Sequence, residues 1–296
     1  MAQTQMALDS LDFDATVALA AKVAPHVDIL EIGTPCIKHN GIELLKTLRA
    51  KFPNNKILVD LKTMDAGFYE AEPFFKAGAD IVTVLGTADI GTIKGVIDVA
   101  NKYGKQAQVD LINVADKKAR TVEVAKLGAH IIGVHTGLDQ QAAGQTPFSD
   151  LALVTGLKTG AKVSVAGGVK AATVKQVVDA GADIVVAGAA IYGAADPAAS
   201  AKEITGLAHG SSASAGGFKW LPWAIAIGAA LLVLSLLNNK APEEAAAEAP
   251  AATEQAVEAA PAEAAPAEAA PAEAAPAAEA APAEAAPAEA APAAAQ

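Results

Sequence analysis

Short runs rich in Val, Ile and Leu alternate with amphipathic stretches through the first 210 residues. Hydrophobic positions at helical spacing predict helices, for example at residues 14–23, 41–51, 90–103 and 171–180. Three helices are expected to end at a glycine, because the phrases KAGAD, KLGAH and DAGAD stand directly before apolar runs. Asp89, Asp116 and Asp139 are expected to cap the amino ends of helices. Eight of the apolar runs are predicted strands, at residues 5–9, 27–33, 56–62, 79–86, 107–113, 130–136, 161–168 and 182–189.

This alternation of strand and helix occurs eight times. Strands that are apolar along nearly their whole length are typical of a parallel sheet buried on both faces. Eight repeats therefore indicate an α/β fold in which residues 1–210 close into a (β/α)8 TIM barrel. The alternative is an open doubly wound sheet. A dinucleotide-binding sheet of that kind carries G-x-G-x-x-G after its first strand, and this chain does not.

Composition divides the rest of the chain into three segments. Residues 211–219 contain the run SSASAGG and form a predicted flexible linker. Residues 220–237 (WLPWAIAIGAALLVLSLL) are apolar throughout and have both tryptophans of the chain at one end. We predict a single transmembrane helix there, because a buried core helix normally keeps a polar face. An oligomerising hydrophobic helix and a fused segment are the alternatives. Residues 238–296 are a predicted disordered tail of Ala, Pro and Glu with a repeated PAEAA unit.

The formal net charge of −11 belongs to the tail. Residues 241–296 contain 11 Glu and no Lys, Arg or Asp, which leaves 22 acidic and 22 basic residues in the rest of the chain. A neutral domain with an acidic tail is a poor candidate for binding nucleic acid. The single cysteine excludes an intramolecular disulfide, and the N-terminus lacks a secretory signal. We therefore expect a cytoplasmic catalytic domain that the apolar helix anchors to a membrane.

Titratable residues gather where the predicted strands end, which is the edge at which barrels of this kind build their active sites. Buried carboxylates repel one another unless cations balance them, and Lys62 supplies only one positive charge. A divalent metal is therefore expected. Oxygen ligands favour Mg²⁺, and Glu31 and Asp60, on adjacent strands, are its predicted ligands. The strand-end residues are Asp9, Glu31, Asp60 and Lys62 with Asp65 just beyond, Asp110 and His135.

Glycines follow the last two predicted strands. Gly167 and Gly168 follow the seventh strand, and Gly188 and Ala189 end the eighth. Residues without bulky side chains let backbone N–H groups approach an anion, and this is the usual phosphate site of such barrels. The sequence therefore predicts a phosphate site built mainly from backbone.

Four motifs resemble the orotidine-5′-phosphate decarboxylase superfamily: ALD at 7–9, EIG at 31–33, DLKTMDAG at 60–67 and AGGV at 166–169. Asp60, Lys62 and Asp65 match the D-x-K-x-x-D signature of that superfamily. Residues 1–210 resemble one branch of it, the 3-hexulose-6-phosphate synthases and 3-keto-L-gulonate-6-phosphate decarboxylases. The stretch HTGLDQQAAGQTPF at 135–148 is similar to the synthases. The decarboxylases usually carry arginines after the histidine and a glutamate where Asp110 stands.

The resemblance implies a Mg²⁺-dependent homodimer with its sites at the interface, where Asp65 reaches the neighbour's site. It implies aldol addition of formaldehyde to D-ribulose 5-phosphate, giving D-arabino-hex-3-ulose 6-phosphate through an enediolate that the metal stabilises. His135 is the candidate general base, because the pKa of an imidazole lies closest to neutral pH. Lys62 is expected to contact the enediolate or substrate hydroxyls.

The remaining site residues are expected to bind the metal and the substrate. Asp9 and Asp110 would bind metal, water or sugar hydroxyls. The amides of Gly167, Gly168, Gly188 and Ala189 would hold the phosphate. Two alternative functions stay open at this point. One is 3-keto-L-gulonate-6-phosphate decarboxylation on the same scaffold, and the other is a membrane-anchored scaffold protein whose barrel serves for docking.

Overall fold

The computed structural model describes residues 1–210. The predicted linker, transmembrane helix and tail, at residues 211–219, 220–237 and 238–296, lie outside the described residues and stay predictions. Within residues 1–210 no helix is both long enough and apolar enough to cross a membrane.

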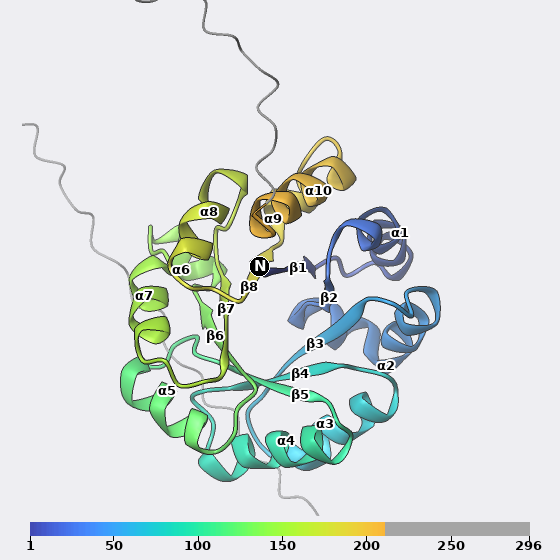
Figure 1. Ribbon diagram of the computed structural model, residues 1–296. Coiled ribbons are helices and arrows are strands. Elements are labelled where there is room, and N and C mark those ends of the chain that lie inside the picture. Colours follow the sequence, from blue (N-terminus) through green and yellow to red (C-terminus); the bar gives the residue numbers. More distant parts are fainter. Residues whose placement is uncertain (211–296) are drawn as a thin grey trace, which may run out of the picture. The chain divides into compact units, whose positions relative to one another are not determined.

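Eight parallel strands close into a barrel in sequence order, with a ring of helices around it (Figure 1). The predicted (β/α)8 barrel is confirmed, and every predicted strand overlaps an observed one. The strands are β1 (Gln3–Leu8), β2 (Ile29–Ile32), β3 (Lys56–Thr63), β4 (Ile81–Leu85), β5 (Gln106–Asp110), β6 (Ile131–His135), β7 (Lys162–Ala166) and β8 (Ile184–Ala187).

The helices follow the strands on the outside of the barrel. A bend at Gly41 divides α2 into two parts, and the predicted helix at 41–51 is the second of them. The helices are α1 (Phe13–Val23), the 3-10 turn η1 (Ala24–His26), α2 (Thr34–Lys51), α3 (Gly67–Lys76), α4 (Ile90–Lys102), α5 (Lys117–Lys126), α6 (Leu138–Ala142), α7 (Phe148–Gly156), α8 (Ala171–Asp179), α9 (Ala189–Tyr192) and α10 (Pro197–Ala208).

Two hydrophobic layers explain why the strands are apolar along their length. Successive side chains of a strand point to opposite faces, so one strand supplies both layers. On β3, for example, Leu58 points into the barrel and Val59 packs under the helices. The inner layer closes one end of the barrel interior. Its buried members are Ile29, Leu58, Ile81, Ile131, Ile184 and Val186.

The three predicted glycine caps are confirmed. Gly78, Gly128 and Gly181 follow α3, α5 and α8 with φ angles of 109°, 91° and 93°. Glycine reaches this region without the steric cost that a Cβ atom brings. Each turn leads directly into the next strand, which keeps the connections on that side of the barrel short.

The predicted aspartate caps give a mixed result. Asp116 caps α5 and accepts a hydrogen bond from the Ala119 N–H at 2.9 Å. Asp89 occupies the N-cap position of α4 without a capping hydrogen bond from its side chain. The prediction for Asp139 is wrong. Helix α6 starts at Leu138, so Asp139 lies inside the helix and the N-cap is Gly137.

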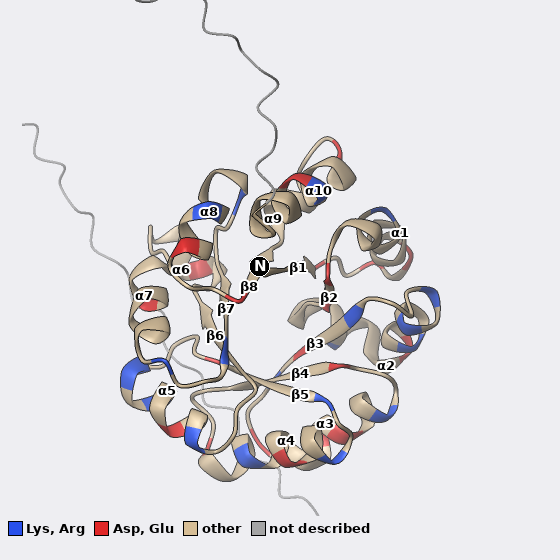
Figure 2. Ribbon diagram, in the orientation of Figure 1, with Lys and Arg blue, Asp and Glu red and all other residues tan. Residues whose placement is uncertain are grey.

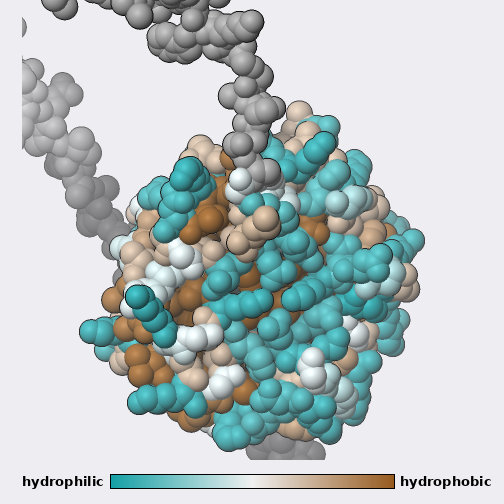
Figure 3. Space-filling view, in the orientation of Figure 1, coloured by the Kyte–Doolittle hydropathy of each residue, from teal (hydrophilic) through white to brown (hydrophobic). Residues whose placement is uncertain are grey.

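Charged residues of both signs are interspersed around the ring of helices (Figure 2). A cluster at the amino ends of the strands joins several elements. Asp80, just before β4, pairs with Arg49 of α2 and accepts hydrogen bonds from Lys105 Nζ at 2.6 Å and the Ile57 N–H at 2.9 Å. Burial raises the pKa of Asp80, but these hydrogen bonds and cations outweigh it and hold the pKa below its ordinary value. The face shown in Figure 3 is mostly hydrophilic.

Candidate active site

A cavity of about 830 Å³ opens at the carboxyl ends of the strands. Every predicted site residue except Asp65 lines it. Those residues are Asp9, Glu31, Asp60, Lys62, Asp110, His135, Gly167, Gly168, Gly188 and Ala189. The structure thus brings together residues at the ends of seven strands, as expected from the way parallel strands end at one edge of a barrel.

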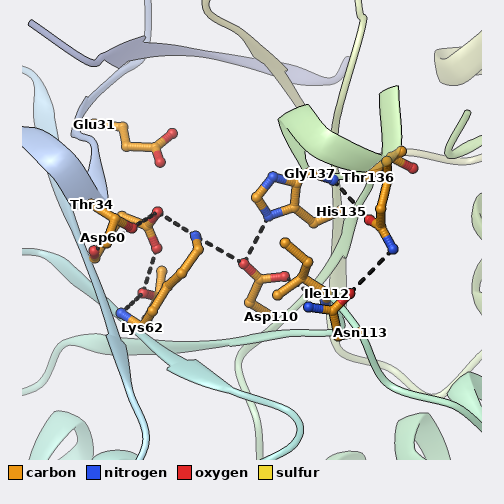
Figure 4. Close-up of polar contacts among 12 residues, drawn as sticks. Glu31, Thr34, Asp60, Lys62, Asp110, Ile112, Asn113, His135, Thr136 and Gly137 are labelled. Atoms are coloured by element: carbon orange, nitrogen blue, oxygen red, sulfur yellow. Dashed lines mark hydrogen bonds and ion pairs between the residues drawn. The ribbon is translucent and has the colours of Figure 1, made fainter. Parts of the chain in front are cut away.

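Lys62 lies between two carboxylates in this cavity (Figure 4). Its Nζ atom is 2.6 Å from Asp60 Oδ2 and 3.2 Å from Asp110 Oδ2. Burial lowers the pKa of the Lys62 ammonium, but the two negative charges outweigh it and raise the pKa above its ordinary value. The lysine therefore stays protonated at neutral pH and is a fixed positive charge in the cavity.

The backbone at Lys62 is irregular. Its φ angle of 48° lies in the left-handed region, and the pairing of β3 with β4 shifts register between Val59 and Thr63. The Lys62 N–H donates to Thr83 Oγ1 at 2.9 Å instead of to the neighbouring strand's backbone. Non-glycine residues rarely adopt such angles, and those that do cluster at functional sites. Strand periodicity points Asp60 and Lys62 the same way, and both do line the cavity, although a bulge lies between the strands there.

Asp110 and His135 form a hydrogen-bonded pair. The His135 Nδ1 atom lies 2.9 Å from Asp110 Oδ2, and the second carboxylate oxygen of Asp110 accepts from the Ile112 N–H at 2.9 Å. Burial raises the pKa of Asp110, but His135, Lys62 and the backbone donor lower it below its ordinary value. An ionised carboxylate only accepts hydrogen bonds, so Nδ1 carries the proton and Nε2 is left with a lone pair. Burial lowers the pKa of His135, and the bond to Asp110 outweighs this and raises it.

Glu31 and Asp9 lie on the other side of the cavity. Glu31 accepts a hydrogen bond from Gln5 Nε2 at 2.7 Å. Burial and the negative charge of Asp60 raise the pKa of Glu31 to about 8. The same two causes raise the pKa of Asp9. Lys62 lowers both pKa values, but less than burial and the charge of Asp60 raise them.

The chemistry of this side fits a divalent cation. The groups are oxygen donors, and an added positive charge would relieve the repulsion that raises their pKa values. Asp60 is also committed to protein partners, because Thr34 Oγ1 donates to its Oδ2 at 2.6 Å and Thr83 Oγ1 to its Oδ1 at 2.7 Å. Among residues 1–210, no group of three or more His, Cys, Asp or Glu side chains is already arranged around a metal position. Glu31 and Asp60 as metal ligands therefore stay a prediction.

The predicted phosphate site lies where β7 and β8 end. Gly167 and Gly168 have φ angles of 113° and 68°. A Cβ atom on Gly167 would lie 2.6 Å from the Thr136 carbonyl oxygen, so only glycine fits there. Lys170, which the sequence analysis did not select, also lines the cavity. Its position two residues after the glycine pair was the signal that could have revealed it, since cations commonly assist backbone amides in binding phosphate.

Asp65 lies apart from the other predicted residues. It is exposed beyond the end of β3, and its Oδ1 atom accepts from the Ala66 N–H at 2.7 Å. It does not line the cavity of its own chain. Within a single copy of the chain, the third residue of the D-x-K-x-x-D signature therefore does not join the first two.

The family model of the orotidine 5′-phosphate decarboxylase / HUMPS family matches residues 2–204. The chain belongs to this family. Residues 2–204 therefore form the barrel of this family, and the cavity at the carboxyl ends of its strands contains Asp60 and Lys62 but not Asp65.

Individual relatives place the chain within the family. It is 87% identical to a 3-hexulose-6-phosphate synthase from Methylomonas aminofaciens over 208 residues, which cover 70% of this chain and all of the relative. A crystal structure of 3-hexulose-6-phosphate synthase from Salmonella typhimurium is 42% identical, with a TM-score of 0.67, and covers 71% of this chain and all of that chain. A 3-keto-L-gulonate-6-phosphate decarboxylase structure from Vibrio cholerae is 26% identical, with a TM-score of 0.64, and covers 71% and 99%.

A polar layer lies deeper in the barrel than the strand-end residues. Gln5, Gln108 and Ser164 line the lower part of the cavity, and the sequence analysis missed them. Gln108 and Ser164 precede Asp110 and Ala166 by two residues, so they face the same interior. Counting back two positions from Asp110 would have found Gln108, whereas the same count from Gly167 and Gly168 leads to Val165 and Ala166 and misses Ser164.

Replacing Asp110 with asparagine tests the histidine pair. In Asp110→Asn the pKa of His135 is expected to fall, because the variant loses the carboxylate charge that outweighs burial. The measurement is an NMR titration of the imidazole C–H signals in protein freed of metal. His130 is the internal control: it stands just before β6, at the opposite end of that strand from His135, and its ring contacts Asn101 and the Ala107 N–H, so its titration should not move. An unchanged or higher pKa of His135 in the variant would contradict the assigned pair.

Proposed function

We propose that this chain catalyses the aldol addition of formaldehyde to D-ribulose 5-phosphate, giving D-arabino-hex-3-ulose 6-phosphate. The observation that carries the proposal is the 87% identity to a synthase named for this product, over the whole length of that relative. The cavity supports it, because it combines a histidine base, a fixed ammonium, buried carboxylates and a glycine-lined anion site. The chain is thus an aldehyde-lyase of the carbon–carbon bond-forming kind.

The reaction begins with removal of a proton from C1 of the pentulose. His135 Nε2 takes this proton, and Asp110 holds the ring in the tautomer that leaves Nε2 unprotonated. The electron pair of the broken C–H bond forms an enediolate across C1 and C2. Lys62, which stays positively charged, is placed to stabilise the negative oxygen. The C1 carbon then forms a bond to the carbon of formaldehyde, whose oxygen gains a proton.

Mg²⁺ is the proposed cofactor, held by Glu31 and Asp60 with Asp9 nearby. When bound, it supplies positive charge that favours ionised substrate oxygens. The raised pKa values of Glu31 and Asp9 support this assignment, since they mark uncompensated negative charge. At neutral pH a bound cation would also keep Glu31 ionised, which its pKa of about 8 otherwise opposes.

The substrate phosphate is proposed to bind the amides of Gly167, Gly168, Gly188 and Ala189. Lys170 adds a positive charge on the same side of the cavity. This arrangement orients C1 of the sugar toward His135. The rival activity, decarboxylation of 3-keto-L-gulonate 6-phosphate, is less well supported, because Asp110, Gly137 and Leu138 depart from the pattern that the decarboxylases usually carry.

The purified chain with Mg²⁺ and ribulose 5-phosphate is expected to consume formaldehyde, measured by loss of the aldehyde and by NMR of the hexulose phosphate. EDTA should abolish the activity and added Mg²⁺ should restore it. His135→Ala is expected to lower kcat by about 10² or more, the usual contribution of a general base. His39→Ala is a matched control on α2, outside the cavity. Release of carbon dioxide from 3-keto-L-gulonate 6-phosphate without formaldehyde fixation would favour the rival activity instead.

We also propose a homodimer in which Asp65 completes the partner's site. Asp65 is exposed and stands outside its own cavity, as such a role requires. Its surroundings support an interface, because Met64 and Tyr69 are 54% and 83% exposed although both are apolar enough to favour burial. Phe68, on the same segment, is 40% exposed.

Mixing two inactive variants tests this dimer. Asp65→Ala combined with His135→Ala is expected to regain activity, because one site of each mixed dimer then contains both native residues. The control is His135→Ala combined with Asp110→Asn, whose residues share one cavity, so no mixed site is intact. Activity is measured after the two proteins are unfolded and refolded together. Failure of the first mixture to recover, with dimers present by sedimentation, would show that Asp65 serves its own chain or no site.

Membrane association through residues 220–237 remains a further proposal, supported by the apolar sequence of that segment and its flanking lysines. The match to the Methylomonas relative spans 70% of this chain and the whole of that relative. A protein of that length therefore exists without a counterpart of the remaining segments, which supports residues 1–210 as a unit able to fold alone.

Cell fractionation tests the anchor. Formaldehyde-fixing activity of the full-length chain is expected in the membrane pellet and in the detergent extract, because the apolar segment partitions into lipid. Activity of residues 1–210 is expected in the supernatant and serves as the matched control. Full-length activity that stays in the supernatant without detergent would argue against membrane association.

A further inference from the structure

A small polar niche lies one layer deeper in the barrel than the His135–Asp110 pair. Gln108 of β5, Gly133 of β6 and Ser164 of β7 form it, and all three line the site cavity. Gln108 and Gly133 precede Asp110 and His135 by two positions, so their positions face the same interior. Ser164 and Gly133 are register partners on neighbouring strands.

Gly133 keeps this niche open. A Cβ atom on Gly133 would lie 3.1 Å from Gln108 Nε2 and 3.4 Å from Ser164 Oγ. The first distance is tighter than an ordinary van der Waals contact, so a methyl group there would crowd the Gln108 amide. The absence of a side chain at Gly133 therefore leaves both hydrogen-bonding atoms facing the cavity.

The polar groups around the niche lack partners. Gln108 and Ser164 are only 7% and 2% exposed. Within residues 1–210, Gln108 Oε1 is buried without a hydrogen-bond partner, and no described residue bonds to the Ser164 hydroxyl. Buried polar groups in proteins are nearly always hydrogen-bonded. Of these groups, the Gln108 Nε2–H and the Ser164 O–H can donate to a ligand in the cavity, whereas Gln108 Oε1 can only accept.

We propose that the niche binds formaldehyde, with the Ser164 hydroxyl and the Gln108 side-chain N–H donating to its carbonyl oxygen. The inference rests on the proposed function and adds the binding place of the second substrate. With only two heavy atoms, formaldehyde is small enough to approach these donors where Gly133 has no side chain. Its carbonyl carbon would then lie next to the sugar carbon that His135 deprotonates.

The same two donors would assist the bond-forming step. As C1 of the enediolate attacks, the new carbon–carbon bond forms and the π electron pair of formaldehyde moves onto its oxygen. Donors aimed at an oxygen that becomes negative stabilise the transition state. His135, which gained the C1 proton, returns it to this oxygen, so protons and charge balance. The C2 oxygen recovers its carbonyl double bond.

Two measurements separate the niche from the rest of the site. The first is the KM for formaldehyde in the complete reaction. The second is exchange of the C1 proton of ribulose 5-phosphate with D₂O when formaldehyde is absent, followed by NMR. Exchange needs the base and the pentulose site only, whereas the complete reaction also needs the niche.

Gly133→Ala fills the niche and is expected to raise the formaldehyde KM by about tenfold or more, as one excess methyl group does in a small pocket. Ser164→Ala removes one donor and is expected to raise it by about three- to tenfold. In both variants the exchange rate should stay within about twofold of the native rate. Gly156→Ala is the matched control, because its Cβ atom would meet nothing within 4 Å and α7 lies outside the barrel.

Each outcome decides the proposal. The proposal is overturned if the formaldehyde KM is unchanged in Ser164→Ala and in folded Gly133→Ala. It is also overturned if these variants lose exchange of the C1 proton to the same extent as they lose condensation with formaldehyde. Circular dichroism reports folding, and Ser164→Ala carries the test alone if Gly133→Ala does not fold. A native protein that neither exchanges the proton nor condenses formaldehyde overturns the proposed function, and the niche with it. Native activity with unaffected variants overturns only the niche.

Discussion

The Lys62 ammonium is shared between two buried carboxylates, and the catalytic half of the cavity depends on it. Without this charge, Asp60 and Asp110 would be buried anions with no cation beside them, a costly arrangement in a protein interior. Asp110 remains ionised in this setting, and its carboxylate then fixes the ring of His135. The left-handed backbone of Lys62 lets the ammonium reach both partners, and Thr83 stabilises that backbone with one hydrogen bond. The irregular end of β3 therefore supports the Asp110–His135 pair, whose histidine lies three strands along the barrel.

The two sides of the cavity differ in electrostatic balance. On the side of β5 and β6, a carboxylate, an ammonium and an imidazole satisfy one another. On the side of β1 and β2, Asp9 and Glu31 have raised pKa values because burial and the charge of Asp60 oppose their ionisation. The proposed proton transfer lies on the balanced side and the proposed cation site on the unbalanced one. Asp60 lies between them and contributes negative charge to both.

The barrel and the gathering of residues at its mouth could be predicted from sequence, because strand periodicity and parallel topology are encoded locally and leave little freedom. The pairing of Asp110 with His135 could not, since it depends on side-chain rotamers of residues 25 positions apart. Strand periodicity also does not reveal the bulge at Lys62, which arises from contacts with the neighbouring strand. Gln108 follows the same periodicity, two positions before Asp110. Neutral side chains such as Gln108 and Ser164 carry no charge that would mark them as site residues in the sequence.

The apolar layer at the closed end of the barrel has a kinetic consequence. Residues such as Ile29, Leu58 and Ile131 are fully buried, so the cavity above them opens only at the carboxyl ends of the strands. On the proposed sites, an aldehyde in the deep polar layer would enter or leave only past the position of the sugar phosphate. Binding would then be ordered, with the aldehyde entering first and the bulkier phosphate ester retaining it until the bond has formed.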